Sequence, residues 1–502
     1  MKPILLLTTL SSLSVSGGAY ASTKAQPNIV IIFTDDHRYD GISALGNRDL
    51  KTPNFDSLVE RGVTFTNTYL QGANSAATST PSRAQLLTGR SVFEIEMTWR
   101  NFPAKYTSFA AAFSEAGYNT FTTGKQNNAE SSMRGFTSGA KLFDLSPAYY
   151  NPHFYLPVQD YRADGKYNIK HLYLVGGENQ EFRVPPAYFY ANKKKGETEP
   201  RLKLEEFDGT HSSEVFATAT ADYITTYSDE KPFLIYLPFH APHDPRNAPQ
   251  KYYDMYPPES LQLPANYAEK HPFDTGDMEA RDELIITYPR KEAEVRKELS
   301  DYYALITHLD DQLGVVLKAI EDKGIADNTL VVFASDSGLG MGSHALMGKQ
   351  NLYDDAGIHV PFVLCGLDIP KNERRTNLCY TYDIYPTLCD IAGVKIPESV
   401  TGKSVKGAIA APNAAAGREE LFFGYKNIQR AIRDEQYKLI EFCVNGERNT
   451  LLFDIKNDPY ETKDLSKDRS YRKVLKHMRE RLVANKSIDA EWGAKFWETY
   501  LK

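Results

Sequence analysis

The sequence predicts an α/β fold: a large, mostly parallel β-sheet sandwiched by helices, followed by a smaller C-terminal α+β subdomain. Over most of the chain, short runs rich in apolar or β-branched residues alternate with helix-length segments. This alternation is typical of βαβ units around a parallel sheet. Beyond residue 400 the pattern changes to short strand-like runs separated by turns, which indicates a second, smaller unit.

The predicted strands of the large sheet are short runs that end at a polar residue, a glycine or a proline. They are residues 28–33, 118–123, 233–237, 329–334 and 361–365. Continuous apolar runs of this length are typical of strands buried on both faces. The helices expected between them are residues 55–61, 109–116, 215–227, 299–323 and 382–392.

Two polar stretches interrupt the alternation. Residues 192–206 resemble a solvated loop, and residues 264–295 resemble an insertion. In the C-terminal part we expect strands at 421–424, 429–433, 437–442 and 451–454, and a helix at 471–484. The predicted organisation is a signal peptide at 1–21, a catalytic domain at 22–400, and a subdomain at 401–502 that completes the substrate pocket.

Composition restricts the class of protein. The 502-residue chain is 41% hydrophobic and 25% charged, which is ordinary for a soluble globular protein. A net charge of −7 argues against a nucleic-acid partner, although a local basic pocket for an anionic substrate remains compatible with it. The four cysteines form no C-x-x-C pair, so the sequence assigns no disulfide pairing.

The N-terminus resembles an export signal. Lys2 precedes a short apolar run that ends at Ala19-Tyr20-Ala21, a typical cleavage site. The run is too short to span a bilayer, so we expect cleavage after Ala21, export, and no membrane anchor.

Unusual polar residues follow four predicted strands. They are Asp35 and Asp36, Lys125, His240 and His243, and Asp336. Ligands of open α/β sheets bind beyond the carboxyl ends of the strands, so we expect these residues to meet at one rim.

The chemistry of this set fits an anionic ester held by a hard cation. Asp35, Asp36 and Asp336 supply carboxylate oxygens, which suit Ca²⁺ or Mg²⁺. The cationic side chains of Arg83, Lys125 and Lys349 can stabilise charge on a sulfuryl or phosphoryl group. His243 could protonate a leaving alkoxide.

The motifs resemble those of the formylglycine-dependent sulfatases of the alkaline phosphatase superfamily. Ser79-Thr-Pro-Ser-Arg83, followed by Leu87-Thr-Gly-Arg90, is similar to the family signature. Supporting motifs follow in the family's order: Asp35-Asp36, Thr123-Gly-Lys125, Pro242-His243, Ser335-Asp336, Gly348-Lys349 and Arg430-Ala-Ile-Arg433. The resemblance implies an alkaline-phosphatase-like fold and a sulfuric ester hydrolase.

The resemblance also implies a modified nucleophile. In the family the first signature residue is oxidised to formylglycine, whose hydrate attacks sulfur with one hydroxyl and expels sulfate with the other. Here the precursor is Ser79. Serine-type signatures resemble those of bacterial periplasmic enzymes matured by a radical-SAM enzyme before export, so that enzyme is an expected partner.

Residue roles carried over from the family are expectations. One calcium ion would be bound by Asp35, Asp36, Ser79, Asp336 and Ser337, with Ser337 standing where the family has Asn or His. Arg83 would stabilise the hydrate, and Lys125, His243 and Lys349 would contact sulfate. Asn127 stands where the family has a proton-accepting histidine, which leaves His37 and His344 as substitute candidates.

The resemblance, together with the export signal and an aromatic content of 12%, implies a sulfated oligosaccharide as the substrate. We expect galactose or N-acetylgalactosamine, sulfated at position 4 or 6, in glycosaminoglycans or mucin glycans, and N-acetylglucosamine or a uronic acid stays open as the sulfated sugar. The candidate sugar-binding residues are Trp99, Arg100, Asn127, His240, Asp244, Arg246, Arg430 and Arg433.

Two alternatives remain open at this point. A phosphatase or phosphodiesterase of the same superfamily would use Ser79 directly and bind two zinc ions. A catalytically inactive glycan-binding protein would keep the pocket, and the departures at Asn127 and Ser337 favour it.

Overall fold

The computed structural model describes residues 26–143 except 99, the strand segments 156–157 and 174–175, and residues 211–502 except 245, 247, 412–415, 490 and 491. The predicted signal peptide (1–21), Trp99 and the polar stretch at 192–206 lie outside the described residues.

The main sheet confirms the predicted α/β class. Over the described ranges it has eight strands, in the order β12–β2–β11–β10–β1–β9–β5–β6. Their bounds are β1 Asn28–Thr34, β2 Gly62–Phe65, β5 Asn119–Lys125, β6 Ser138–Phe143, β9 Phe233–Pro238, β10 Thr329–Ser335, β11 Phe362–Cys365 and β12 Glu373–Arg375. The central strands β10, β1, β9 and β5 are all parallel, whereas β11 runs antiparallel to both of its neighbours.

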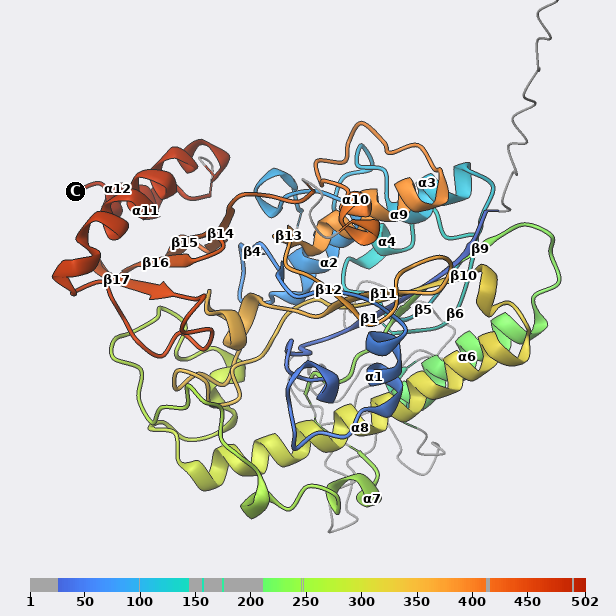
Figure 1. Ribbon diagram of the computed structural model, residues 1–502, viewed down its shortest axis with the longest axis horizontal. Helices are drawn as coiled ribbons and strands as arrows, with labels where there is room; N and C mark the ends of the chain where they lie inside the picture. The colour runs from blue at the N-terminus through green and yellow to red at the C-terminus, as the bar shows by residue number, and fades with distance from the viewer. Residues whose placement is uncertain are drawn as a thin grey trace, which may run out of the picture.

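Helices cover both faces of this sheet (Figure 1). One face packs against α2 Ser79–Thr88, α3 Phe109–Glu115, α9 Ile384–Ala392 and α10 Lys406–Ala410. The other packs against α1 Pro53–Glu60, α6 Ser212–Thr226 and α8 Glu292–Asp322.

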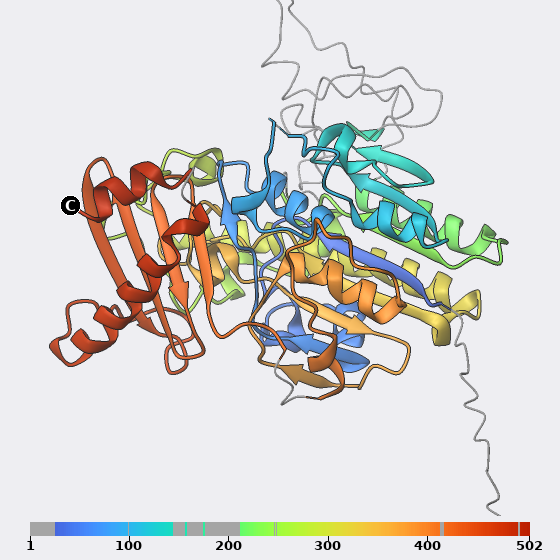
Figure 2. The ribbon, with the colours of Figure 1, turned by 90° about the horizontal axis from the view of Figure 1, so that it is seen from above.

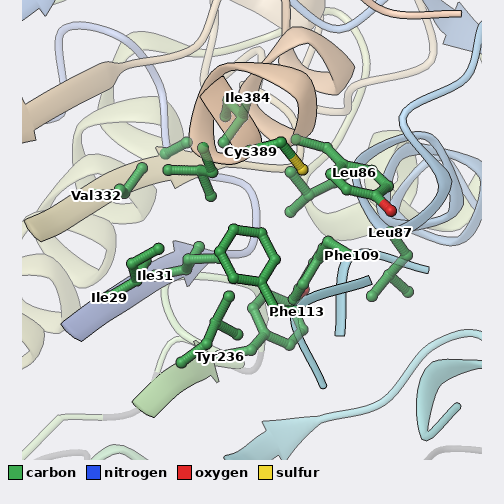
Figure 3. Packing of buried hydrophobic residues seen from close by; sticks show 14 of the residues in the cluster. Ile29, Ile31, Leu86, Leu87, Phe109, Phe113, Tyr236, Val332, Ile384 and Cys389 are labelled. Carbon is green, nitrogen blue, oxygen red and sulfur yellow. The ribbon is translucent and has the colours of Figure 1, made fainter. Parts of the chain in front are cut away.

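Alternation along β1 divides the core between these two layers. Ile29 and Ile31 point to the α2–α3–α9 side, where Figure 3 shows them beside Phe109 and Phe113. Val30 and Ile32 belong to the core on the α6–α8 side. All four β1 side chains are fully buried, as expected for a central parallel strand covered on both faces.

Helix α8 is longer than the sequence pattern predicted. It begins at Glu292, seven residues before the expected start at 299. Its first turns are rich in charged residues, and Val295 is the apolar residue of these turns that is fully buried. The apolar stripe is therefore too sparse there to be distinguished from the preceding loop.

A second sheet, visible at the left of Figure 2, lies in the C-terminal part and carries two helices on one face. Its order in the described chain is β17–β16–β15–β14–β4. The bounds are β4 Gly72–Ala73, β14 Leu421–Tyr425, β15 Gln429–Arg433, β16 Tyr437–Val444, β17 Glu447–Asp454, α11 Arg472–Ala484 and α12 Ala494–Tyr500.

Strand β4 comes from the N-terminal part of the chain, so the two parts share a sheet. It pairs parallel with β14, with Gly72 opposite Gly424. A two-residue strand has no readable periodicity, which is why the sequence did not predict this connection.

Among the described helices, none combines the length and apolar character needed to cross a membrane. The four cysteines, all within the described residues, are buried free thiols.

The contact between β4 and β14 gives a stability prediction. Gly72 has φ 125°, and a Cβ added there would lie 1.9 Å from the Gly424 carbonyl oxygen. Gly46 has nearly the same φ, 123°, with nothing within 4 Å of such a Cβ. We expect Gly46→Ala to cost roughly 1–3 kcal/mol through backbone strain alone. Gly72→Ala should cost about 1–3 kcal/mol more through the clash.

Chemical denaturation of both variants and the parent measures this difference. Equal losses of unfolding free energy in the two variants would show that the β4–β14 pair accommodates the added Cβ without further destabilisation. That result would contradict a tight connection between the two sheets.

Candidate active site

The carboxyl ends of the four central strands bring together the polar residues that the sequence predicted to meet. Asp35 and Asp36 follow β1, Asp336 follows β10, and Lys125 ends β5. His243 lies in the loop after β9. All five residues are buried.

Ser79 is the first residue of α2, a helix whose ten residues are all buried. Its hydroxyl donates to Asp35 Oδ1 at 2.9 Å and accepts from Lys349 Nζ at 3.1 Å. The helix ends at Gly89, whose φ of 63° glycine adopts without strain. The start of a helix also presents partial positive charge, which favours an anionic group beside Ser79.

Arg83 lies one helical turn after Ser79 and fixes two of the carboxylates. Its Nη2 donates to Asp35 and its Nε donates to Asp336, each at 2.9 Å. Although burial opposes a charged guanidinium, Asp336 and Asp35 raise the pKa of Arg83 further. Arg83 is therefore a permanent cation beneath the site.

Asp36 has a strained backbone, with φ 64°. Several interactions hold it: its N–H donates to Asp336 Oδ1 at 3.1 Å, and its carbonyl accepts from the Tyr302 hydroxyl at 2.6 Å. The carboxylate accepts from Ser337 Oγ at 2.9 Å and from Lys349. A left-handed aspartate held this firmly is typical of a functional site.

Lys125 reaches the site because β5 is irregular at its end. The β5–β6 register shifts between Thr122 and Gly124. Gly124 has φ 72°, and a Cβ there would lie 2.1 Å from the Pro238 carbonyl oxygen. The Lys125 ammonium contacts Asp35. Burial lowers the pKa of Lys125, although Asp35 opposes that shift.

The turn that carries Lys349 is held by a segment that the sequence analysis assigned only to an insertion. This segment is the 3₁₀-helix η6 (Arg281–Ile285). Glu283 accepts the backbone N–H groups of Met347 at 3.0 Å and Gly348 at 2.8 Å, and pairs with Arg290. No periodic pattern marks so short a helix, so residue spacing gave no signal for it.

His243 is a neutral imidazole. Burial, followed by repulsion from Lys125 and Lys349, lowers its pKa well below the usual value. Nδ1 lies 2.6 Å from the Asp244 carbonyl oxygen and therefore donates to it, which leaves Nε2 as an acceptor 3.9 Å from Asp36. The expected role as a proton donor would thus require the ring to gain a proton first.

With all six side chains ionised, the charges of this cluster cancel. Asp35, Asp36 and Asp336 face three cations, Arg83, Lys125 and Lys349. Despite burial, Lys125 and Arg83 hold the pKa of Asp35 well below its usual range. Burial raises the pKa of Asp36 to about 8; Lys349 opposes this shift, and repulsion from Asp35 and Asp336 adds to it.

The donor set fits a divalent cation. Ligand atoms of Asp35, Asp36 and His243 all lie within 4.8 Å of one another. Asp336 and the Ser337 hydroxyl adjoin Asp36, so further oxygen donors are at hand. Carboxylate and hydroxyl oxygens suit a hard cation. Such an ion would make the nearly neutral cluster net positive, which favours an anionic substrate.

Ser79 opens into a cavity of about 570 Å³. The lining residues include Ser79, Arg100, Lys125, Asn127, His243, Arg281, Asp282, Lys349 and Gln350. Two candidate sugar-binding residues, Arg100 and Asn127, therefore lie on its wall. Asn127 Oδ1 is buried without a hydrogen-bond partner, so it can accept from a bound group. Sequence reasoning missed Arg281, Asp282 and Gln350.

Four other candidate sugar-binding residues lie away from the cavity wall. Arg430 is fully buried, pairs with Asp489, and packs over the Trp492 ring at 4.7 Å. Arg433 pairs with Asp354 at 3.2 Å. These arginines pair with carboxylates inside the fold and do not line the Ser79 cavity, so their contact with substrate stays a prediction.

Arg246 and His240 do not line the Ser79 cavity either. Arg246 is buried against Glu298. His240 is buried with its ring 4.9 Å from that of His243, and its Nε2 lies 3.1 Å from the Asp244 carbonyl oxygen. Asp244 itself accepts from Arg281 at 2.8 Å. Among the described residues that line this cavity none comes from 401–502, and the expected contribution of the C-terminal part to the substrate pocket stays a prediction.

The two substitute histidines do not reach Ser79. His37 is fully buried, with its ring packed edge-on against Phe55 and Phe333. His344 stacks on Tyr353, with ring centroids 3.9 Å apart. Neither lines the cavity.

Comparison with protein families agrees with this geometry. The Sulfatase family model matches residues 27–394, and the model for the C-terminal part of N-sulphoglucosamine sulphohydrolase matches residues 342–487. This chain belongs to the sulfatase family. It is a sulfuric ester hydrolase by that membership, which agrees with the resemblance noted from the motifs.

Relatives of this sulfatase act on different substrates. It is 30% identical over 485 residues to an ulvan-active sulfatase of Formosa agariphila, covering 93% of this chain and 83% of the relative. It is 24% identical to an N-acetylglucosamine-6-O-sulfatase of Bacteroides thetaiotaomicron, covering 95% and 89%.

Solved structures share the fold. One protein, in complex with its substrate D-glucosamine-2-N,6-O-disulfate, aligns with a TM-score of 0.69 at 21% identity, covering 93% of this chain and 98% of that one. A phosphonate monoester hydrolase of Agrobacterium radiobacter aligns with a TM-score of 0.69 at 22% identity, covering 92% and 95%.

The donor set gives a prediction about metal binding. A divalent cation that binds only the folded state should raise the thermal unfolding midpoint, with a rise that grows as the logarithm of its concentration. Asp36→Asn should abolish this rise because the substitution removes a carboxylate from the cluster. Asp322→Asn alters an exposed carboxylate and should leave the rise intact. Equal cation responses in both variants would contradict binding at Asp36.

Proposed function

We propose that this sulfatase hydrolyses an O-sulfate ester of a carbohydrate through a formylglycine made from Ser79. The observation that carries the proposal is the position of Ser79. It stands at the start of α2, on the wall of a cavity, and within hydrogen-bond distance of Asp35 and Lys349. The hydrated aldehyde would supply both the nucleophilic hydroxyl and the hydroxyl that later expels sulfate.

The side chains around Ser79 have separate tasks in this proposal. Arg83 fixes the carboxylates of Asp35 and Asp336, and so holds them beside the nucleophile. Lys125 and Lys349 stabilise the sulfate oxygens, where charge develops as the ester bond breaks. His243 also lines the cavity, with its Nε2 3.9 Å from Asp36. After it gains a proton from solvent, His243 is the candidate to donate that proton to the departing sugar alcohol.

The cation in this proposal is one calcium ion. Asp35, Asp36, Ser79, Asp336 and Ser337 would hold it, and it would polarise the ester oxygen. The all-oxygen character of these five donors supports calcium over zinc.

The substrate proposal keeps galactose or N-acetylgalactosamine, sulfated at position 4 or 6, as the first candidates. The relatives named for ulvan, for N-acetylglucosamine 6-O-sulfate and for hexuronate 2-O-sulfate support adding ulvan, N-acetylglucosamine and uronate substrates to the panel. Arg100, Arg281 and Asp282 on the cavity wall offer both donors and acceptors to sugar hydroxyls.

Maturation and location are part of the same proposal. A radical-SAM maturating enzyme would oxidise Ser79 before export, and the matured protein would work in the periplasm or outside the cell. A catalytic unit at 22–400 with a separate subdomain at 401–502 stays a prediction.

The decisive experiment is mass spectrometry of the tryptic peptide 62–83 from protein made in a host with the maturating enzyme. We expect a loss of two hydrogens at Ser79, together with release of sulfate from at least one member of the sugar panel. Protein from a host lacking that enzyme is the control and should be unmodified and inactive. Modified protein that binds sulfated sugars without releasing sulfate would instead be the glycan-binding alternative.

Phosphate ester hydrolysis is the second candidate, favoured by the shared fold of a phosphonate monoester hydrolase. His243 beside Asp35 and Asp36 supplies the nitrogen donor that zinc accepts. Elemental analysis distinguishes the two: one calcium supports sulfate chemistry, and two zinc ions with an unmodified Ser79 support phosphate chemistry.

Asn127 gives a kinetic prediction. Asn127 lines the cavity and its Oδ1 has no partner within the fold, so Asn127→Ala should remove one hydrogen bond to the bound hydrate or substrate. We expect kcat/KM to fall about tenfold, the usual worth of one such bond. Asn457→Ala changes an exposed asparagine in the C-terminal part and should leave kcat/KM unchanged. An unchanged kcat/KM in Asn127→Ala would mean that Asn127 is only a wall residue.

A further inference from the structure

A second hollow of about 740 Å³ adjoins the cavity that contains Ser79. Ala76 and Ala280 line both spaces, so they form the ridge between them. Both residues have small side chains, so neither places a bulky group between the two spaces.

The two spaces differ in charge. The Ser79 cavity is lined by four cationic side chains: Arg100, Lys125, Arg281 and Lys349. In the adjoining hollow the described lining contains no lysine or arginine but three carboxylates, Asp274, Asp277 and Glu279. The charge of the lining side chains therefore changes from mostly positive to negative across the ridge.

The carboxylates of the second hollow are only partly compensated. Lys426 Nζ contacts Asp277 Oδ1 at 2.9 Å. Within the described chain no ion pair joins a cation to Asp274 or Glu279, which are both exposed. Burial lowers the pKa of His271, also in the lining, to about 4, so that ring adds no positive charge at neutral pH.

The hollow also offers an aromatic surface. Tyr288 is 47% exposed, and its hydroxyl accepts a hydrogen bond from the backbone N–H of His271 at 3.0 Å, which fixes the tyrosine ring in place. Phe273 and Met278 add apolar surface to the lining. Sugars bind to proteins through an aromatic face together with carboxylates that accept from their hydroxyls, so this lining suits a sugar ring.

We propose that this hollow binds the sugar unit next to the sulfated one, and that it selects an uncharged sugar over a uronic acid or a second sulfated unit. The inference rests on the proposed function, because it takes the first cavity to hold the sulfated sugar. A neutral neighbour donates hydroxyl groups to Asp274 and Glu279, whereas an anionic neighbour is repelled by them. The substrate class that follows is an oligosaccharide in which sulfated and neutral sugars adjoin.

Binding measurements test the proposal without requiring turnover. The probes are methyl glycosides, neutral disaccharides and uronate-containing disaccharides of 4- and 6-sulfated galactose and of N-acetylglucosamine 6-sulfate. Calorimetry on the Ser79→Ala protein gives Kd, and kcat/KM is measured on the matured enzyme. We expect the neutral disaccharide to bind about tenfold more tightly than the methyl glycoside, because a gain of that size is about what one good aromatic contact contributes. The uronate disaccharide should show no such gain.

Three variants identify the cause. Tyr288→Ala should remove the gain for the neutral disaccharide, and Tyr288→Phe should keep it because the ring remains. The double variant Asp274→Asn, Glu279→Gln should improve binding of the uronate disaccharide about threefold to tenfold at low salt, since exposed charges interact modestly. This improvement should fade in high salt, where screening acts within a few ångströms. None of these variants should change the affinity for the methyl glycosides.

The outcomes separate this proposal from the proposed function. Equal affinity for methyl glycosides and neutral disaccharides, or equal affinity for neutral and uronate disaccharides, would overturn the second-hollow proposal whether or not sulfate is released. The expected pattern of Kd values with no sulfate release from matured enzyme would overturn the proposed function alone.

Discussion

The carboxylate of Asp35 is the interaction on which the rest of the site depends. It follows the central strand β1, is fully buried, and accepts hydrogen bonds from both Ser79 and Arg83. Lys125 contacts the same group. An unpaired carboxylate in this position would be costly, because burial penalises a charge that lacks partners. The partners that remove this cost are also the groups that the proposed chemistry needs.

This constraint links the catalytic geometry to the architecture. Asp35 comes from β1, Lys125 from the end of β5, Arg83 from α2 on one face of the sheet, and Lys349 from a turn held by Glu283. The site therefore lies where elements that are distant in sequence meet at the carboxyl edge of the sheet, as in other open α/β folds. Asp36 stores backbone strain there because contacts from Asp336, Tyr302 and Lys349 hold it in place.

The second sheet has a structural role toward this site rather than a place on the cavity wall. Its arginines Arg430 and Arg433 are buried against Asp489 and Asp354. The sheet is tied to the N-terminal part through β4, where a side chain on Gly72 would collide with the Gly424 carbonyl oxygen. The loop segment at 271–290 lines both the second hollow and, through Arg281 and Asp282, the Ser79 cavity.

The sequence by itself determined the α/β class, most helices and strands, and the residues at the carboxyl ends of the strands. Short buried runs and the Ser79–Arg83 signature can be recognised from neighbouring residues alone. The site residues could be grouped because parallel strands present their carboxyl ends at one edge of the sheet. Only the tertiary structure decided which cations face the cavity. Arg100 lies on its wall whereas Arg430 is buried elsewhere, and the residues around each arginine do not encode that difference. The antiparallel direction of β11, the joining of β4 to the second sheet, and the entry of Arg281 and Asp282 into the cavity likewise arise from contacts between residues far apart in the chain, which no local spacing encodes.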